Sequence, residues 1–185
     1  FNAVTFKAIK PLDKLVLDFD AVFTIDSIEV KHGNGEPAAT TFERIGSRMW
    51  INLQKKVSTG ESATVAVHYN GIPREAPQPP WDGGFTWRRT PNGEPWIGVS
   101  CQTNGADIWW PCKDHPSDEP DSMSLKFTVP EALTCISNGK LRGTKNNNDG
   151  TRTFSWFVST PVNNYGVSLY ICLLYTSDAA DESVG

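Results

Sequence analysis

Apolar and polar residues alternate along most of this chain. Between residues 62 and 69, Ala63, Val65 and Val67 are separated by single, less apolar residues, and residues 123–129 repeat the pattern. A period of two places successive side chains on opposite faces of a strand, so these segments predict half-buried antiparallel strands. The pattern predicts strands over residues 3–9, 14–19, 21–32, 40–45, 48–54, 62–69, 85–89, 96–101, 123–129, 133–137, 140–144, 151–158 and 166–171.

Turn-forming residues separate these segments. Asn70-Gly71, Asn138-Gly139 and the run 146–150 supply asparagine and glycine, which accept positive φ angles or bond to their own backbone. No segment shows a sustained apolar stripe at helical spacing. The sequence therefore predicts an all-β, sandwich-like domain of hairpins, with two sheets or one strongly curved sheet.

A proline-rich stretch, residues 71–84, interrupts the strands. Proline donates no backbone hydrogen bond and favours extended backbone in the residue before it, so the stretch predicts a long connecting loop. The parts on either side, of about seventy and ninety residues, have little apolar content for independent units. One continuous domain is therefore favoured over two.

The composition argues against two classes of partner. With 185 residues and 38% hydrophobic content, the chain is long enough for one domain with a sizeable core. Its formal charge of -4 provides no cationic surface for nucleic acid, and no apolar run is long enough to span a bilayer. We expect no nucleic-acid partner and no membrane span, and the sequence does not indicate a compartment.

The segment 172–185 differs in character from what precedes it. It begins CLLYTSDAADE and follows a strand-like run without a turn signal. Its codons can be written as a transposon-type sequencing adapter read in frame, so we expect a native domain over residues 1–171 and adapter read-through over 172–185, the alternative being an acidic tail. Three cysteines then remain, Cys101, Cys112 and Cys135, an odd number that argues against a purely disulfide-bonded framework.

The stretch WWPCKDHPSDEPDS, residues 109–122, concentrates reactive side chains. Its carboxylates and His115 would suit calcium or a transition metal if the loop curled around the ion. Their spacing fits no calcium-loop or zinc template. The favoured interpretation is a rigid loop, stiffened by Pro111, Pro116 and Pro120, with no metal ligands. At least one of Trp109 and Trp110 is expected to be buried in the core.

Catalytic motifs are absent from the sequence. The three histidines lie far apart, and there is no HExxH helix, no G-x-S-x-G elbow and no phosphate-binding glycine loop. Cys101 and Cys112 could form a disulfide if adjacent, or remain free and buried. We therefore name no catalytic residue and no metal ligand.

The order of several short motifs resembles a known family. Val99-Ser-Cys-Gln102 is followed by Trp109-Trp-Pro-Cys-Lys-Asp-His-Pro116 and then by a strand ending in Val129-Pro130. This order resembles the N-terminal β domain of aminopeptidase N-like zinc metallopeptidases, which include the leukotriene hydrolase. The stretches 11–18 and 60–71 are also similar to that domain, so the resemblance covers nearly all of residues 1–171.

The resemblance implies a fold, a partner domain and one ligand contact. The family's domain is a saddle-shaped structure of antiparallel and mixed β-sheets, and it packs on a thermolysin-like catalytic domain of the same polypeptide that binds zinc. By this resemblance, Gln102 is a substrate-binding residue that accepts a hydrogen bond from the free N-terminus of a peptide. Such a charge-assisted contact contributes roughly 1.5–3 kcal/mol.

Departures from the family limit what is carried over. The HExxH helix and the GxMEN strand of the family are missing from the chain, so this fragment alone is expected to be inactive. The loop continues through 117–122, longer and more acidic than in the best-known members.

A carbohydrate-binding or other β-sandwich interaction module is the alternative. It is motivated by the tryptophans, of which five could form a flat face: Trp81, Trp87, Trp96, Trp109 and Trp110. Tryptophans clustered on one surface would favour this alternative. Burial of Trp109 and Trp110, with Gln102 at a sheet edge, would favour the peptidase domain.

Overall fold

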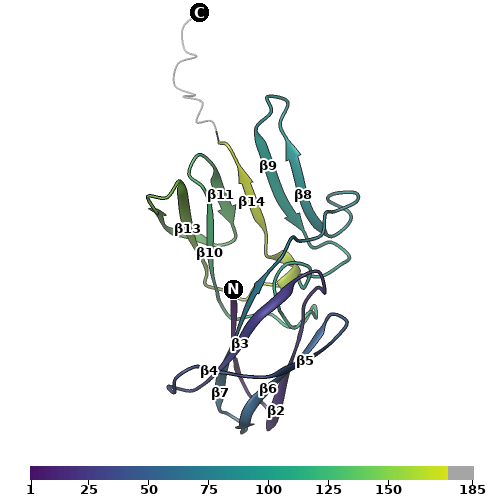
Figure 1. Ribbon diagram of the computed structural model, residues 1–185, viewed down its shortest axis with the longest axis vertical. Helices are drawn as coiled ribbons and strands as arrows, with labels where there is room; N and C mark the ends of the chain where they lie inside the picture. The colour runs from purple at the N-terminus through teal and green to yellow at the C-terminus, as the bar shows by residue number, and fades with distance from the viewer. Residues whose placement is uncertain (175–185) are drawn as a thin grey trace, which may run out of the picture.

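The structure, a computed structural model, describes residues 1–174, and these are built from β-strands joined by turns (Figure 1). No α-helix occurs in this range, where the helical structure is the 3-10 turn η1 (Asn164–Gly166). The all-β prediction is confirmed. The strands are β1 (Asn2–Lys7), β2 (Leu12–Asp18), β3 (Thr24–His32), β4 (Ala38–Ala39), β5 (Phe42–Ile45), β6 (Arg48–Val57), β7 (Ser62–Asn70), β8 (Gly84–Arg89), β9 (Pro95–Ser100), β10 (Met123–Pro130), β11 (Thr134–Ser137), β12 (Lys140–Asn146), β13 (Thr151–Val158) and β14 (Leu169–Cys172).

Every strand expected from the alternation overlaps one of these, but several limits differ. The two-residue β4 was not predicted, because it is too short to show a period. β3 begins at Thr24 and not at residue 21, since Phe23 N bonds to Asp20 O in a turn. β14 begins at Leu169 and not at residue 166, because η1 precedes it.

The strands form four sheets whose ladders are antiparallel. Two sheets, β1-β7-β3-β4 and β2-β6-β5, come from residues before the proline-rich stretch. The other two, β10-β13-β12 and β11-β14-β9-β8, come from residues after it. Figure 1 shows the first pair in the lower half of the molecule and the second pair in the upper half.

Each half encloses its own apolar core. In the lower half, residues on the inward positions of the strands, such as Leu17, Ile51 and Val65, are at most 1% exposed. In the upper half, Phe85, Phe154 and Leu169 pack together with Cys135. Burying one such aliphatic or aromatic side chain stabilises the fold by about 1.5–3 kcal/mol. Thus the domain predicted as continuous contains two hydrophobic cores.

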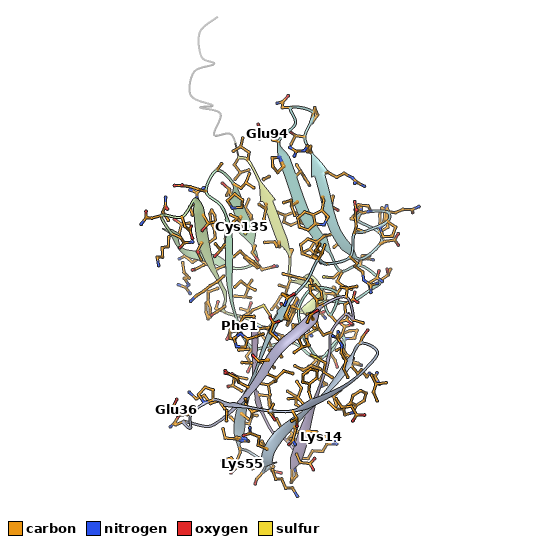
Figure 2. All side chains as sticks on the ribbon, in the orientation of Figure 1. Phe1, Lys14, Glu36, Lys55, Glu94 and Cys135 are labelled. Atoms are coloured by element: carbon orange, nitrogen blue, oxygen red, sulfur yellow. The ribbon has the colours of Figure 1, made fainter. Side chains whose placement is uncertain are left out.

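Residues 101–122 join the two halves. Cys112 forms a bridge with Asp18 of β2, and the Asn2 side chain donates to Pro111 O. Trp110, Pro111 and Cys112 are buried. Figure 2 shows Phe1, the residue before Asn2, at the boundary between the halves. These contacts agree with the interpretation of residues 109–122 as a structural loop.

The expected domain limit after residue 171 falls inside a strand. Cys172 is the last residue of β14, where it pairs with Thr134 of β11 and Trp96 of β9. The proposed adapter-derived segment lies mostly outside the described residues, which end at residue 174. That proposal therefore remains a prediction.

Candidate functional site

The candidate site begins at the turn that follows β9. Cys101 is buried in the upper core, and the next residue, Gln102, is exposed. Gly105 N donates to Cys101 O at 3.0 Å and closes the turn. Thr103 and Gly105 both have positive φ angles, +64° and +85°. Within the described part of the chain, the exposed Gln102 side chain makes no hydrogen bond.

The proline-rich loop supports this turn from one side. Ser100 Oγ donates to Pro80 O at 2.8 Å, and Gly83 N donates to the Asn104 side chain at 2.9 Å. Trp81, in the same loop, is 71% exposed. The predicted connecting loop is therefore bonded to Ser100 and Asn104, on either side of Gln102 in the sequence.

Asp114 supports the turn from the other side. Its Oδ1 accepts from Ala106 N at 3.0 Å, and its own backbone N donates to Asp18 Oδ2 at 3.2 Å. The carboxylate lies so close to Gly105 that a side chain there would overlap it. Asp114, which matches the family motif, therefore fixes the shape of the loop that carries Gln102.

An ion pair between a buried carboxylate and an exposed arginine links the proline-rich loop to the lower half. The Asp20 side chain is 4% exposed, and Arg74 contacts its Oδ2 at 2.5 Å. Val22 N donates to the other carboxylate oxygen of Asp20. The sequence did not reveal this pair, because 54 positions separate its members and neither lies in a motif.

Asp107 lies near three other carboxylates, those of Asp18, Asp20 and Asp114. Burial, followed by the nearby carboxylates of Asp114, Asp18 and Asp20, raises the pKa of Asp107 to about 6, although Arg74 acts to lower it. In residues 1–174, no three His, Cys, Asp or Glu side chains are grouped so as to hold a metal ion. The described residues therefore do not fit a zinc site.

Asp107→Asn is expected to stabilise the protein at neutral pH. Because the folded pKa is about 6 and the ordinary value is 3.8, the folded state holds the proton more tightly. Asp107 therefore does not lower the free energy of unfolding below pH 3.8. Its ionisation lowers that free energy as the pH rises through about 6. Since the side chain is partly exposed, the gain at pH 7.5 is about 1 kcal/mol, or roughly 2–4 °C in Tm.

The measurement is a thermal melt of each protein at pH 4 and pH 7.5. Asp13→Asn, a change of an exposed carboxylate on β2, is the matched control and should leave Tm unchanged. Equal Tm for the Asp107 variant and the parent protein at pH 7.5 would contradict the expected cost of ionising Asp107.

The three cysteines buried in the upper core are free thiols. Cys101, Cys112 and Cys135 are buried, and none forms a disulfide. Burial raises the pKa of Cys101 to about 11 and that of Cys135 to about 12, and it also raises the pKa of Cys112. These side chains are therefore protonated at neutral pH and do not serve as nucleophiles.

The tryptophans do not form one flat face. Trp110 is buried, as expected for at least one of the pair, and half-buried Trp109 packs against Phe85 and Phe127. On the β8–β9 hairpin, Trp87 lies opposite Ile97, whereas Trp96 lies opposite Arg88. Because directly opposed residues share a face and successive residues alternate, Trp87 and Trp96 point to opposite sides of the sheet.

Comparisons of sequence with known proteins find no relative: no family model and no curated protein matches the chain. Among the residues of the described part, no helix is long and apolar enough to cross a membrane.

Comparison of the fold finds clear neighbours. The M1 zinc metallopeptidase from Deinococcus radiodurans superposes with a TM-score of 0.76 at 21% identity, over 92% of this chain and 36% of that chain. A mutant of that enzyme bound to a Tyr-Ser-Ala substrate gives a TM-score of 0.73 at 22% identity, over the same shares of the two chains. A two-domain M1 zinc metallopeptidase mutant bound to L-tryptophan superposes with a TM-score of 0.74 at 22% identity, over 92% of this chain and 37% of that chain.

This chain spans little more than a third of the length of the structures it matches. At 21–22% identity, the similarity to these structures shows only that this chain shares their fold. The resemblance noted in the motifs is confirmed at that level: residues 1–174 have the fold of one part of the M1 zinc metallopeptidases.

Proposed function

We propose that this chain is the N-terminal, substrate-facing domain of a zinc-dependent aminopeptidase, which removes N-terminal residues from peptides. The observation that carries the proposal is the superposition of 92% of the chain on an M1 zinc metallopeptidase, together with the exposure of Gln102 on its supported turn. Zinc and the catalytic groups would come from a catalytic domain of the same polypeptide, because the described residues offer no metal ligands.

Gln102 contributes recognition of the peptide N-terminus. Its amide oxygen accepts a hydrogen bond from the α-ammonium group, which a blocked peptide lacks. The turn is held by Asp114 on one side and by the proline-rich loop on the other, so little conformational entropy is lost when the ligand binds. The role of the residue is positioning the substrate and does not include proton transfer.

An exposed apolar surface supports the presence of a docked domain. On the outer face of the sheet β11-β14-β9-β8, Ile136 lies opposite Tyr170, which lies opposite Gly98. Trp96 is two residues from Gly98 on the same face, and it is 52% exposed. Contiguous apolar surfaces of this kind mark sites of protein contact. We assign this face to the catalytic domain.

The arrangement of the tryptophans favours the peptidase domain over a carbohydrate-binding module. A sugar platform made of the five tryptophans requires rings that share a face, whereas Trp87 and Trp96 lie on opposite faces and Trp110 is buried.

Two experiments test the proposal. The first is recovery of the uninterrupted gene beyond Ile171, which is expected to encode HExxH in the following domain. A stop codon or an unrelated module there would end the peptidase assignment.

The second experiment is Gln102→Ala in the complete enzyme. Loss of a contact of roughly 1.5–3 kcal/mol lowers kcat/KM for a peptide with a free N-terminus by about 10- to 150-fold. Zinc content, measured by metal analysis, should not change. Gln78→Ala, an exposed residue of the proline-rich loop, is the matched control and should retain full activity. Unchanged kinetics for the Gln102 variant would remove the role assigned to it.

A further inference from the structure

Five asparagines of this chain are each followed directly by a glycine. The pairs are Asn34-Gly35, Asn70-Gly71, Asn92-Gly93, Asn104-Gly105 and Asn138-Gly139. Glycine has no Cβ that hinders approach to its backbone nitrogen, and asparagine is among the residues that are chemically unstable on heating. In such a pair the glycine nitrogen reacts with the asparagine side chain when the two groups meet. The contacts of each pair therefore decide whether the reaction takes place.

The reaction is a hydrolysis that passes through a cyclic imide. The glycine nitrogen loses its proton to water and forms a bond with Cγ of the asparagine. The bond between Cγ and Nδ2 breaks, and Nδ2 leaves as ammonia. Water then opens the ring at either of its carbonyl groups, which gives aspartate or isoaspartate. The net change consumes water, releases ammonia and places a carboxylate where an amide was, with no oxidant and no cofactor.

Both reacting groups of the pair at Asn104 are held by hydrogen bonds. Asn104 Oδ1 accepts from Gly83 N at 2.9 Å. The nitrogen that would attack, Gly105 N, donates to Cys101 O at 3.0 Å. The backbone of Gly83 also packs closely on the side chain, since a Cβ added there would lie 2.5 Å from Asn104 Cβ. Closure of the imide ring would require both hydrogen bonds to break.

Two other asparagine side chains of these pairs are also bonded. Asn138 Oδ1 accepts from Ser168 N at 2.6 Å, and its Nδ2 donates to Gly166 O at 2.9 Å. Asn70 Nδ2 donates to Asp26 Oδ1 at 2.6 Å. Each side chain must leave its partners before it can turn toward its own backbone.

The side chains of Asn34 and Asn92 make no hydrogen bond within the described part of the chain, and both residues are exposed. The glycine nitrogen of each pair makes one turn bond, to His32 O at 2.9 Å in the first and to Thr90 O at 2.8 Å in the second. Exposure alone does not separate these pairs from the others, because Asn104 is exposed as well. The difference lies in the bonds that hold the side chain.

We propose that Asn34 and Asn92 are sites of spontaneous deamidation and that Asn104, in the turn that carries Gln102, is protected from it. Asn92 lies in the turn between β8 and β9, at the upper end of the molecule, where Figure 2 labels Glu94. Deamidation adds a negative charge at this end of the chain. The inference is independent of the proposed function, because the reaction requires only water.

The test is incubation of this chain at pH 7.5, followed by digestion with trypsin and tandem mass spectrometry. Trypsin cleaves after Arg89 and Lys113, so one peptide, residues 90–113, contains both Asn92 and Asn104. In the folded chain, Asn92 should react within about fivefold of its rate in the free peptide, because one turn bond must break. Asn104 should react about 30-fold more slowly than in the free peptide, because two bonds must break.

The matched control is a synthetic peptide with the sequence of residues 90–113. It contains the same two pairs without the fold, and each rate in the folded chain is divided by the rate at the same position in this peptide. Equal ratios for Asn92 and Asn104 would overturn the proposal. An unmodified Asn92 in a folded chain whose control peptide reacts would also overturn it.

A second arm measures the charge of the intact protein. Deamidated chains carry an added carboxylate and separate as an acidic species on ion exchange. The double variant Asn34→Gln and Asn92→Gln should form at most about a fifth as much of this species as the parent chain, because the remaining pairs are held by side-chain bonds. An undiminished acidic species in the double variant would place the reaction at other residues and contradict the assignment.

Discussion

Gly105→Ala is expected to lower the free energy of unfolding by about 3 kcal/mol, which combines the strain of a positive φ angle with a steric overlap. The φ of Gly105 is +85°, and its added Cβ would lie 2.6 Å from Asp114 Cγ. Relief of this overlap requires movement of Asp114 and hence of the turn that carries Gln102. The midpoint of urea unfolding, measured by tryptophan fluorescence, gives the loss of stability.

Gly60→Ala separates the two contributions. Its φ is +87°, nearly that of Gly105, but apart from its two chain neighbours no described residue has an atom within 4 Å of its added Cβ. The cost there should be about 1 kcal/mol, from backbone strain alone. If both variants lose the same stability, the contact between Gly105 and Asp114 contributes nothing, and Asp114 does not fix the turn.

The strands could be predicted from the sequence because their signals are local. The alternation of Ala63, Val65 and Val67 within β7 and the glycines at the turns are visible within a few residues. β4 was missed for the same reason, since two residues carry no period.

The junction between the halves could not be predicted, because its contacts join distant residues. Asp18 bridges to Cys112, and the members of the Asp20–Arg74 pair lie 54 positions apart. Nothing in a short window distinguishes these aspartates from solvated ones. The second core was not predicted, because part of it comes from Ala106, Ile108 and Trp110, which lie outside the alternating strands.

Gln102 could be selected only through the resemblance. Its neighbours Cys101 and Thr103 give no sign of a ligand, and a glutamine at the end of a strand is ordinary. What the structure adds is the support of the turn by Asp114 and by the proline-rich loop. Those supports depend on tertiary contacts that the alternation pattern does not encode.

Arg74→Ala is expected to lower the free energy of unfolding by about 3 kcal/mol, because it leaves a buried carboxylate without its cation. Asp20 is 4% exposed, and Arg74 is 43% exposed, which places the cost at the lower end of the range for buried pairs. The loss is measured as the shift of the urea midpoint at pH 7.5. Adding Asp20→Asn to the variant should restore part of the stability, because the amide carries no charge that needs a partner.

Arg88→Ala is the matched control for this prediction. Arg88 and Glu75 form an ion pair of 2.9 Å, but their side chains are 60% and 54% exposed. Water and salt screen such a pair, so its removal should cost less than about 1 kcal/mol. The difference between the two variants therefore measures the effect of burial on an ion pair. If Arg74→Ala costs no more than Arg88→Ala, then Asp20 is not held as a buried charge, and the link between the proline-rich loop and the lower half is weaker than its geometry indicates.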